Sequence, residues 1–313
     1  MASSRLVRNL LIAIALGAVV ALALAATASV RETLDALARF RWRLGPAIVL
    51  AVGASWALRF AKWHFYLRCL EIPLAWWPSL QVFLAGFTMA ISPGKLGEVL
   101  KAILVRERVG TPVIRTASAV MAERLTDVAG LVLLGGLGVT ALPHGPLLLG
   151  GLALALVAAV VALQAPAVSR PAQRLLPGRL VEPVRLFVHG GRALLAPRAL
   201  AVALALSIVA WFLECLAFAL ILDGLAVPLP LRSATFVYAF ASLAGAVSML
   251  PGGLGVAEGS LTALLAGLGT PLPEAAAGTL LVRAATLWLA VALGVVTVAA
   301  AFRRSAAPQR AGV

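Results

Sequence analysis

Charged side chains inside apolar stretches are the first candidates for chemistry in this chain. The segment Glu123-Arg124-Leu125-Thr126-Asp127 lies near the start of an apolar run over 116–142. Arg124 and Asp127 are three residues apart on one helix face, so we expect Asp127 to orient Arg124. A charge at the centre of a membrane span costs about 2.5–3.5 kcal/mol, so these charges need partners or a wet cavity. The segment predicts either a site for a polar ligand or a self-neutralising cluster at the level of the lipid headgroups.

Other ionisable residues also occur within apolar runs. Arg59 and Lys62 share one helix face with Tyr66, and they either bind a ligand or extend towards the membrane surface. The secondary candidates for the site are Arg59, Lys62, Glu123, Glu214 and Arg283.

Two glycine- and proline-containing stretches interrupt apolar runs. The first is Pro93-Gly94-Lys95-Leu96-Gly97-Glu98, and the second is Pro251-Gly252-Gly253-Leu254-Gly255-Val256-Ala257-Glu258. Proline lacks a backbone donor and glycine disfavours helix, so the chain breaks at both places. A break at membrane depth has to be buried in protein or line a watery cavity. Paired breaks in two halves of a chain indicate a transport site near the midplane, and the other interpretation is a surface turn at each place.

The two broken stretches also supply candidate ligands for a headgroup. The three glycines of the second break allow backbone amides to approach a ligand at a helix N-terminus, while Lys95 and Arg124 supply positive charge. Glu98 and Glu258 follow the breaks, where each could cap a helix, contact a positive group or take up a proton. The substrate-binding candidates are Lys95, Glu98, Arg124, Asp127, Gly252, Gly253, Gly255 and Glu258.

Composition identifies the protein class. The chain has 313 residues, of which 62% are hydrophobic, and this predicts an integral membrane protein with a single membrane domain over 1–313. The net charge of +14 comes from residues in loops beside apolar runs, so we expect contact with an anionic lipid surface, chiefly through Arg170–Arg198, and not with nucleic acid. The chain has two cysteines and no metal-binding or nucleophile motif, so we expect no catalytic residue, metal or cofactor.

The apolar runs predict an all-α polytopic protein with about six transmembrane helices and two re-entrant helical hairpins. The expected spans are 10–28, 46–70, 116–142, 146–165, 199–222 and 274–302, and the hairpins are 79–105 and 232–268. Residues 30–44 predict an amphipathic helix at the membrane surface.

This arrangement gives two inverted repeats, about 46–142 and 199–302, joined by a basic linker over about 166–198. Lys and Arg gather in the loops on the side of the termini, so both termini are expected in the cytoplasm. The basic segment Arg31–Arg43 falls on the opposite side and is the exception to this charge pattern. We expect it to bind at the membrane interface.

Three motifs of this sequence resemble the signatures of a known family. Pro93–Glu98, Glu123–Asp127 and Pro251–Glu258 look like those of the flippase-like family, the transmembrane region of lysylphosphatidylglycerol synthases and its stand-alone relatives. The resemblance covers roughly 47–302, and its third motif is the most specific. The family usually has Arg at the position of Lys95. The lysine of this chain keeps the positive charge but lacks the bidentate fork of a guanidinium. In the synthases the resemblance implies a membrane flippase and a separate soluble domain for aminoacyl transfer.

The resemblance leads to two expectations for function. Only 11 residues follow Phe302, so aminoacyl transfer is not expected. The first expectation is translocation of a polar- or anionic-headgroup lipid across the bacterial cytoplasmic membrane, through a site formed by the two hairpins. The alternative is a non-catalytic membrane subunit that supports a lipid- or cell-envelope-modifying enzyme as its partner. A lipid-modifying enzyme is disfavoured because the three histidines are scattered, at positions His64, His144 and His189.

The predicted topology can be tested by labelling. In a variant without Cys69 and Cys215, a cysteine in place of His144 should react with a membrane-impermeant maleimide added to intact cells, because the loop 142–146 is expected outside. A cysteine in place of Arg310 is the cytoplasmic control. Labelling at position 144 only after the cells are opened would contradict the topology.

Overall fold

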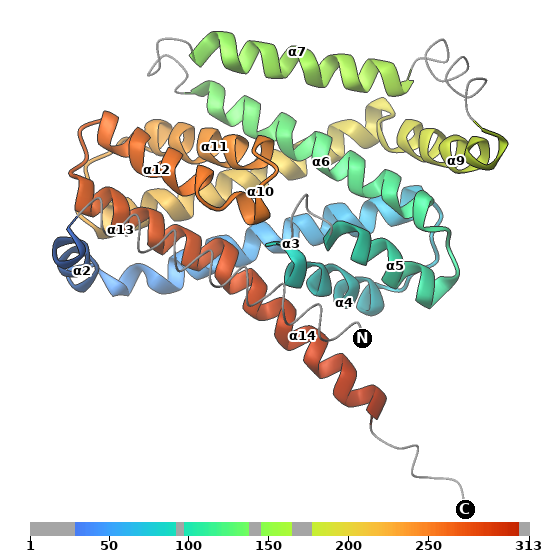
Figure 1. Cartoon of the computed structure of the whole chain (residues 1–313), viewed down its shortest axis with the longest axis horizontal. Coiled ribbons are helices and arrows are strands. Elements are labelled where there is room, and N and C mark those ends of the chain that lie inside the picture. Colours follow the sequence, from blue (N-terminus) through green and yellow to red (C-terminus); the bar gives the residue numbers. More distant parts are fainter. Residues whose placement is uncertain (1–28, 92–96, 138–144, 165–176, 307–313) are drawn as a thin grey trace, which may run out of the picture.

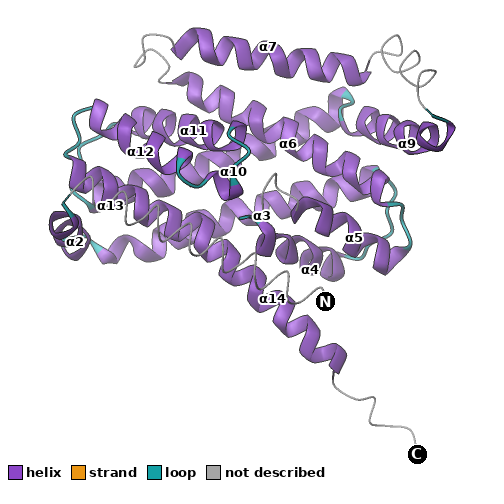
Figure 2. Ribbon diagram, in the orientation of Figure 1, coloured by secondary structure: helices purple, strands orange, loops and turns teal. Residues whose placement is uncertain are grey.

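The computed structural model describes residues 29–91, 97–137, 145–164 and 177–306, and all regular elements within these ranges are helical (Figures 1 and 2). The first half contains α2 (Val30–Ala38), η1 (Trp42–Leu44), α3 (Gly45–Cys69), α4 (Trp76–Gly86), η2 (Phe87–Met89), α5 (Gly97–Val109), α6 (Val113–Gly135) and α7 (Gly145–Gln164). The second half contains α9 (Gly178–Leu194), α10 (Pro197–Gly224), α11 (Leu231–Val247), η5 (Pro251–Gly253), α12 (Val256–Gly267), α13 (Leu272–Arg283), η6 (Ala284–Trp288) and α14 (Leu289–Ala306).

Three of the described helical stretches are long and apolar enough to cross a membrane: Trp42–Cys69, Pro197–Gly224 and Leu272–Ala300. Shorter apolar helices cover Gly150–Ala162 and Leu231–Val247. The chain is therefore an all-α polytopic membrane protein, as its composition predicts. The expected span 116–142 corresponds to α6, which ends at Gly135, while residues 138–142 and the expected span 10–28 lie outside the described residues.

Helices α3, α6 and α10 form the centre of the bundle, and α10 packs on both of the others. Small residues allow this approach, since a Cβ atom on Gly130 of α6 would lie 3.4 Å from the Ser207 side chain of α10. Association of helices in lipid depends on such close packing and on polar contacts, because apolar side chains gain little by leaving lipid for protein. Between α2 and η1, Phe40 packs tightly against Gly224 at the end of α10 and is buried there.

The second break forms the tip of a hairpin made by α11 and α12, which begins and ends at the α2 end of the molecule (Figure 1). Gly252 and Gly253 adopt positive φ angles of 61° and 66°, which favour glycine. A Cβ atom on Gly253 would lie 3.0 Å from Gly245 Cα, so a side chain there would push the tip away from α11.

Helices α4 and α5 pack together around the first break and begin and end at the α9 end (Figure 1). Residues 92–96 of this break, Lys95 among them, lie outside the described residues. The second break lies close to the last described residue before the first break, since a Cβ atom on Gly252 would lie 3.1 Å from Ile91 Cγ2. That these hairpins are re-entrant in a bilayer and related as inverted repeats stays a prediction.

The last long helix contacts both hairpins. It runs from α13 through a π-helical turn, η6, into α14. Leu287 of the π turn approaches Gly252 at the second hairpin tip. Further along, a Cβ atom on Gly294 would lie 2.5 Å from the Thr88 backbone nitrogen in η2. This helix therefore connects the tip of the second hairpin with η2 of the first.

Surface helices account for the two predicted amphipathic segments. The segment 30–44 is α2 followed by η1, with Thr33 and Ala36 buried and Leu34 exposed. Within the basic linker the structure describes α9, which packs on α6 where Gly190 faces Ser118, whereas Arg170 and Arg174 lie outside the described residues.

The contact between α14 and η2 gives a stability prediction. Gly294→Ala should lower the apparent Tm of the protein in detergent, because the new methyl group meets the backbone of Thr88 and overpacking costs about 1–3 kcal/mol. Gly259→Ala in α12 is the matched control, since its Cβ position has no neighbour within 4 Å, and we expect an equal or higher Tm. Equal Tm values for both variants would show that α14 does not pack on η2 at this glycine.

Candidate functional site

A cavity of about 280 Å³ lies in the middle of the bundle, bordered by α3, α5, α6, α10 and the ends of both hairpins. Among the described residues, its charged lining comprises four cationic side chains and three carboxylates, a net charge of +1 when all are ionised. The cations are Arg59, Lys101, Arg124 and Arg283, and the carboxylates are Glu123, Asp127 and Glu214. Aromatic and aliphatic side chains complete the lining, among them Trp56, Phe83, Phe87, Leu131, Trp211 and Leu287.

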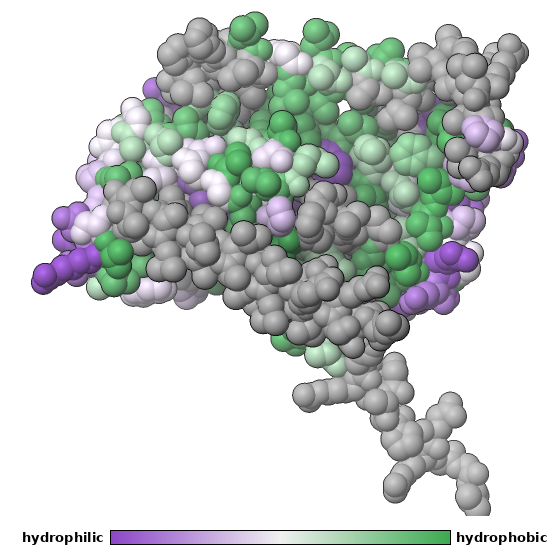
Figure 3. Space-filling view, viewed as in Figure 1, coloured by the Kyte–Doolittle hydropathy of each residue, from purple (hydrophilic) through white to green (hydrophobic). Residues whose placement is uncertain are grey.

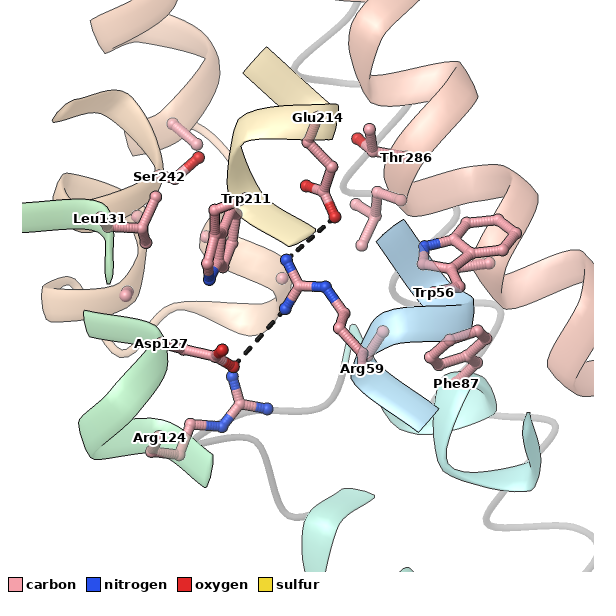
Figure 4. A pocket seen from close by; sticks show the side chains of 18 of the residues that line it. Trp56, Arg59, Phe87, Arg124, Asp127, Leu131, Trp211, Glu214, Ser242 and Thr286 are labelled. Atoms are coloured by element: carbon pink, nitrogen blue, oxygen red, sulfur yellow. Dashed lines mark hydrogen bonds and ion pairs between the residues drawn. The ribbon is translucent and has the colours of Figure 1, made fainter. Parts of the chain in front are cut away.

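Arg59 of α3 bridges two carboxylates across the cavity. Its Nη2 lies 3.0 Å from Glu214 Oε1 on α10, and its Nη1 lies 3.5 Å from Asp127 Oδ2 on α6 (Figure 4). The Trp211 ring stacks on the guanidinium, with 4.0 Å between Arg59 Cζ and the ring centroid. Such a guanidinium is held by charge on its edge and by an aromatic ring on its face, which fixes its orientation towards the cavity.

Lys62 supports Asp127 from behind the cavity. Its ammonium lies 2.5 Å from Asp127 Oδ1 and 2.7 Å from Ser207 Oγ, and the whole residue is buried. Ser207 Oγ in turn donates to Asp127 Oδ1 at 3.1 Å. Asp127 is therefore held by α3 and α10 as well as by its own helix, and Figure 4 shows Arg124 beside it. Neither Lys62 nor Arg59 extends to the membrane surface, so that interpretation is wrong for both residues.

Glu214 is the second anionic centre, and its two oxygens have separate partners. Oε1 accepts hydrogen bonds from Ser55 Oγ and Arg59 Nη2, both at 3.0 Å. Oε2 accepts from the Tyr238 hydroxyl of α11 at 2.8 Å. The carboxylate thus joins α3, α10 and α11 at the wall of the cavity.

The first hairpin contributes an ion pair of its own. Lys101 of α5 lies with its Nζ 2.7 Å from Glu123 Oε2 of α6, and both residues are buried. The same ammonium stands over the Trp63 ring, 4.3 Å from the ring centroid. The two carboxylates of the segment 123–127, Glu123 and Asp127, are therefore paired with cations from other helices.

The second hairpin is held by Arg283. Its Nε lies 2.6 Å from Glu258 Oε1, and its Nη2 donates to the Gly252 carbonyl at 2.7 Å. Glu258 Oε2 accepts from the Gly255 amide at 2.7 Å, so this carboxylate caps α12. Each oxygen of Glu258 thus has a partner within the protein. Of the three roles considered for this residue, the one seen in the structure is the helix cap.

The predicted site residues divide into three groups in the structure. Those that line the cavity are Arg59, Glu123, Arg124, Asp127, Glu214, Gly252, Gly253 and Arg283. Lys62, Gly255 and Glu258 lie behind the lining, in contact with residues that form it. Lys95 and the side chain of Glu98 lie outside the described part of the chain.

The amides of the second break differ from the expectation. The Gly253 amide donates to the Leu250 carbonyl at 2.9 Å, and the Gly255 amide donates to Glu258. Neither is available to a ligand in this conformation, because the tight turn and the cap use both donors. The side chains of the cavity, not these two amides, present the charge to a ligand.

Sequence reasoning missed several residues of the site, namely Ser55, Lys101, Trp211 and Tyr238. Lys101 precedes several charged residues in a helix of mixed polarity, so it resembles a solvated residue in the sequence. Its position four residues after Gly97, on the helix that restarts after the first break, is the signal that could have identified it.

Comparison with known proteins gives two findings. The sequence model of the family described as "Lysylphosphatidylglycerol synthase TM region" matches residues 10–294. A "UPF0104 membrane protein" of Methanothermobacter thermautotrophicus is 32% identical over 91 residues, which is 29% of this chain and 27% of that relative. The chain thus matches about a quarter of the length of this curated relative.

The pair Lys101–Glu123 leads to a prediction about stability. Lys101→Met should destabilise the protein by about 3–5 kcal/mol, because it leaves a buried carboxylate without its partner. The double variant Lys101→Met/Glu123→Leu should recover most of this loss, as measured by thermal unfolding in detergent. Arg108→Met, on the same helix but exposed, is the control and should change little. If the double variant were less stable than Lys101→Met, the pair would not be the source of the loss.

Proposed function

Since the chain belongs to the family of the lysylphosphatidylglycerol synthase TM region, and is thus a membrane protein of lipid metabolism or transport, we propose that it translocates a lipid with a polar or anionic headgroup. In this proposal the headgroup occupies the central cavity while the acyl chains stay in the bilayer. The protein lies in the bacterial cytoplasmic membrane with both termini in the cytoplasm, and the two hairpins enter from opposite faces as parts of inverted repeats.

The observation that carries the proposal is the charged cavity between the two hairpins. Ionisable side chains are costly within apolar spans and mark pathways for polar substrates. The cavity volume of about 280 Å³ is near the lower end for ligand sites, which suits a headgroup and not a whole lipid. The surrounding rings, such as Trp56 and Phe87, provide apolar surface for the glycerol and the first methylene groups.

Competition for existing ion pairs provides a way to bind and release the headgroup. A phosphate that approaches Arg59 competes with Asp127 and Glu214 for the guanidinium, and a positive group of the headgroup can take the released carboxylates. The described part of the lining has a net charge of +1, which balances a single negative charge. Because the pairs exist before binding, the charges are never left unpaired when the headgroup leaves.

Movement of one hairpin against the other would expose the cavity to each face in turn. Gly252 of the second break lies against Ile91, which precedes the first break, and the second hairpin is held by the contacts of Arg283. Separation at this contact opens a route from the side on which a hairpin enters, as in alternating access. The helix α9 would meanwhile rest on the anionic leaflet, since Arg185 is mostly exposed on it.

The proposal predicts headgroup-dependent transport in liposomes. Purified protein in phosphatidylcholine liposomes should move phosphatidylglycerol with a fluorescent acyl chain between leaflets, as measured by dithionite quenching. Arg124→Gln should reduce this rate roughly tenfold or more, because it removes a charged hydrogen-bond donor from the cavity. Arg185→Gln on the exposed face of α9 is the matched control and should keep the rate.

Two outcomes would contradict the proposal. A wild-type rate in the folded Arg124→Gln variant would show that the cavity does not hold the headgroup. The absence of transport for phosphatidylglycerol and for a zwitterionic and an aminoacylated lipid would favour the alternative, a membrane subunit that supports a lipid- or cell-envelope-modifying enzyme. Chemical turnover of any of these lipids would instead identify an enzyme.

A further inference from the structure

A second cavity, of about 540 Å³, lies at the end of the molecule that carries α2. Its wall is formed by α2 and the residues after it, by the loop from α10 to α11, and by the loop from α12 to α13. The lining comprises Ala36, Arg39, Arg41, residues 224–229, residues 268–271 and Glu274. None of these residues lines the central cavity, and Figure 3 shows hydrophilic side chains projecting at this end.

Two arginines and one carboxylate give this cavity its charge. Arg39 is 74% exposed at its side chain, and its Nη2 lies 3.9 Å from Glu274 Oε1. So long and exposed an ion pair is weak and readily exchanged for a ligand. Arg41 is held more firmly, since its Nη2 lies 2.8 Å from Asp223 Oδ2 and donates to the Asp223 carbonyl.

The structure leaves a donor and an acceptor of this cavity unused. Arg41 Nε and Glu274 Oε2 are both buried, and neither has a hydrogen-bond partner within the part of the chain that the structure describes. Buried polar atoms are almost always hydrogen-bonded, so each such atom needs an explanation. A ligand that carries both an acceptor and a donor, bound between Arg41 and Glu274, would give each of these two atoms a hydrogen-bond partner after small side-chain movements.

The surface beside this cavity has the pattern of a helix that lies at the membrane interface. Leu34 is 59% exposed and Trp42 is 63% exposed, so large apolar side chains flank the arginines on the outer surface of α2 and η1. Amphipathic helices with this pattern lie in the membrane interface, and tryptophan is enriched there. A molecule bound between Arg39 and Arg41 therefore has lipid beside it.

We infer that this second cavity binds the phosphate group of a membrane lipid, with Arg39 and Arg41 as the phosphate ligands and Glu274 accepting a hydrogen bond from a hydroxyl or ammonium group of the same headgroup. Guanidinium groups are well suited to phosphate because their planar forks donate two parallel hydrogen bonds. The inference also accounts for the basic segment Arg31–Arg43, which the predicted topology places on the side where the other loops have few basic residues. It concerns binding alone and does not require the protein to translocate lipid.

Peptide-resolved hydrogen exchange in maltoside detergent, which contains no phosphate, tests the inference. Dioctanoyl phosphatidylglycerol should slow exchange in the loops 223–231 and 268–274, and dioctanoylglycerol, which has no phosphate, should not. Arg39→Gln/Arg41→Gln should require roughly ten times more phosphatidylglycerol or more for the same protection, because two charged donors are lost. Arg31→Gln/Arg43→Gln is the matched control, since it removes two arginines of the same segment that do not line the cavity.

Glycerol 3-phosphate separates the two sources of this chemistry. Protection by glycerol 3-phosphate at the same concentrations would support a phosphate site but overturn its assignment to a lipid. Equal protection by dioctanoylglycerol, or unchanged affinity in Arg39→Gln/Arg41→Gln, would overturn the site. If the loss of the Arg41–Asp223 pair unfolds the double variant, the same measurement is made with Arg39→Gln alone. This variant is expected to stay folded, because the Arg39 side chain is mostly exposed. Exchange in the peptides around Arg59 and Asp127 reports the central cavity separately.

Discussion

The cost of charge inside an apolar helix bundle is the constraint on which this structure depends. Arg59, Lys62 and Lys101 each reach a carboxylate on a different helix, at 3.0 Å, 2.5 Å and 2.7 Å. Breaking such a buried pair leaves one charge uncompensated, which costs more than the pair gains over apolar packing. The pairs therefore specify how α3, α6, α10 and the α4–α5 hairpin face one another, while apolar contacts between these helices are less selective in lipid. The same groups form the wall of the central cavity, so one set of side chains determines both the arrangement of helices and the polarity of the site.

The close approach of backbones is a second constraint, and it acts at the hairpin tips. Gly253 has no room for a side chain against Gly245, and Gly294 has none against Thr88. Arg283 then uses its guanidinium to hold both the carbonyl of Gly252 and the carboxylate of Glu258. Non-helical backbone within a membrane protein needs internal partners for its polar groups, and here Arg283 serves the Gly252 carbonyl directly and holds Glu258, which accepts from the Gly255 amide. The second tip is thus fixed by contacts that a movement of α13 could change.

The sequence was sufficient to predict the helical class, the long spans of α3 and α10, the amphipathic α2 and the position of the second break. These features depend on local composition, which proline, glycine and apolar periodicity express directly. It was not sufficient to predict which charged residues meet. Lys62 looked as able to reach the membrane surface as to enter the core, and only the packing of α10 places Ser207 and Asp127 around its ammonium. The burial of Lys101 could not be predicted for the same reason, because its partner Glu123 lies on another helix. The role of Glu258 as a cap was one of three open alternatives, and the choice depends on Arg283, which comes from a later helix.

The π-helical turn at Ala284–Trp288 changes how the sequence of the last long helix has to be read. A π turn contains one residue more than an α-helical turn, so the residues after it are rotated by about 100° from the positions that a continuous α-helix would give them. The residues 272–283 and 289–306 therefore follow two helical wheels and not one. A single helical wheel drawn through both segments would assign Gly294 to the wrong side of the helix, and the residues that face η2 would no longer group on one side of that wheel. If this turn became α-helical with the same number of residues, α14 would rotate and its packing face would turn away from η2 of the first hairpin, so the π geometry of this turn is as much a part of the architecture as the residues that compose it.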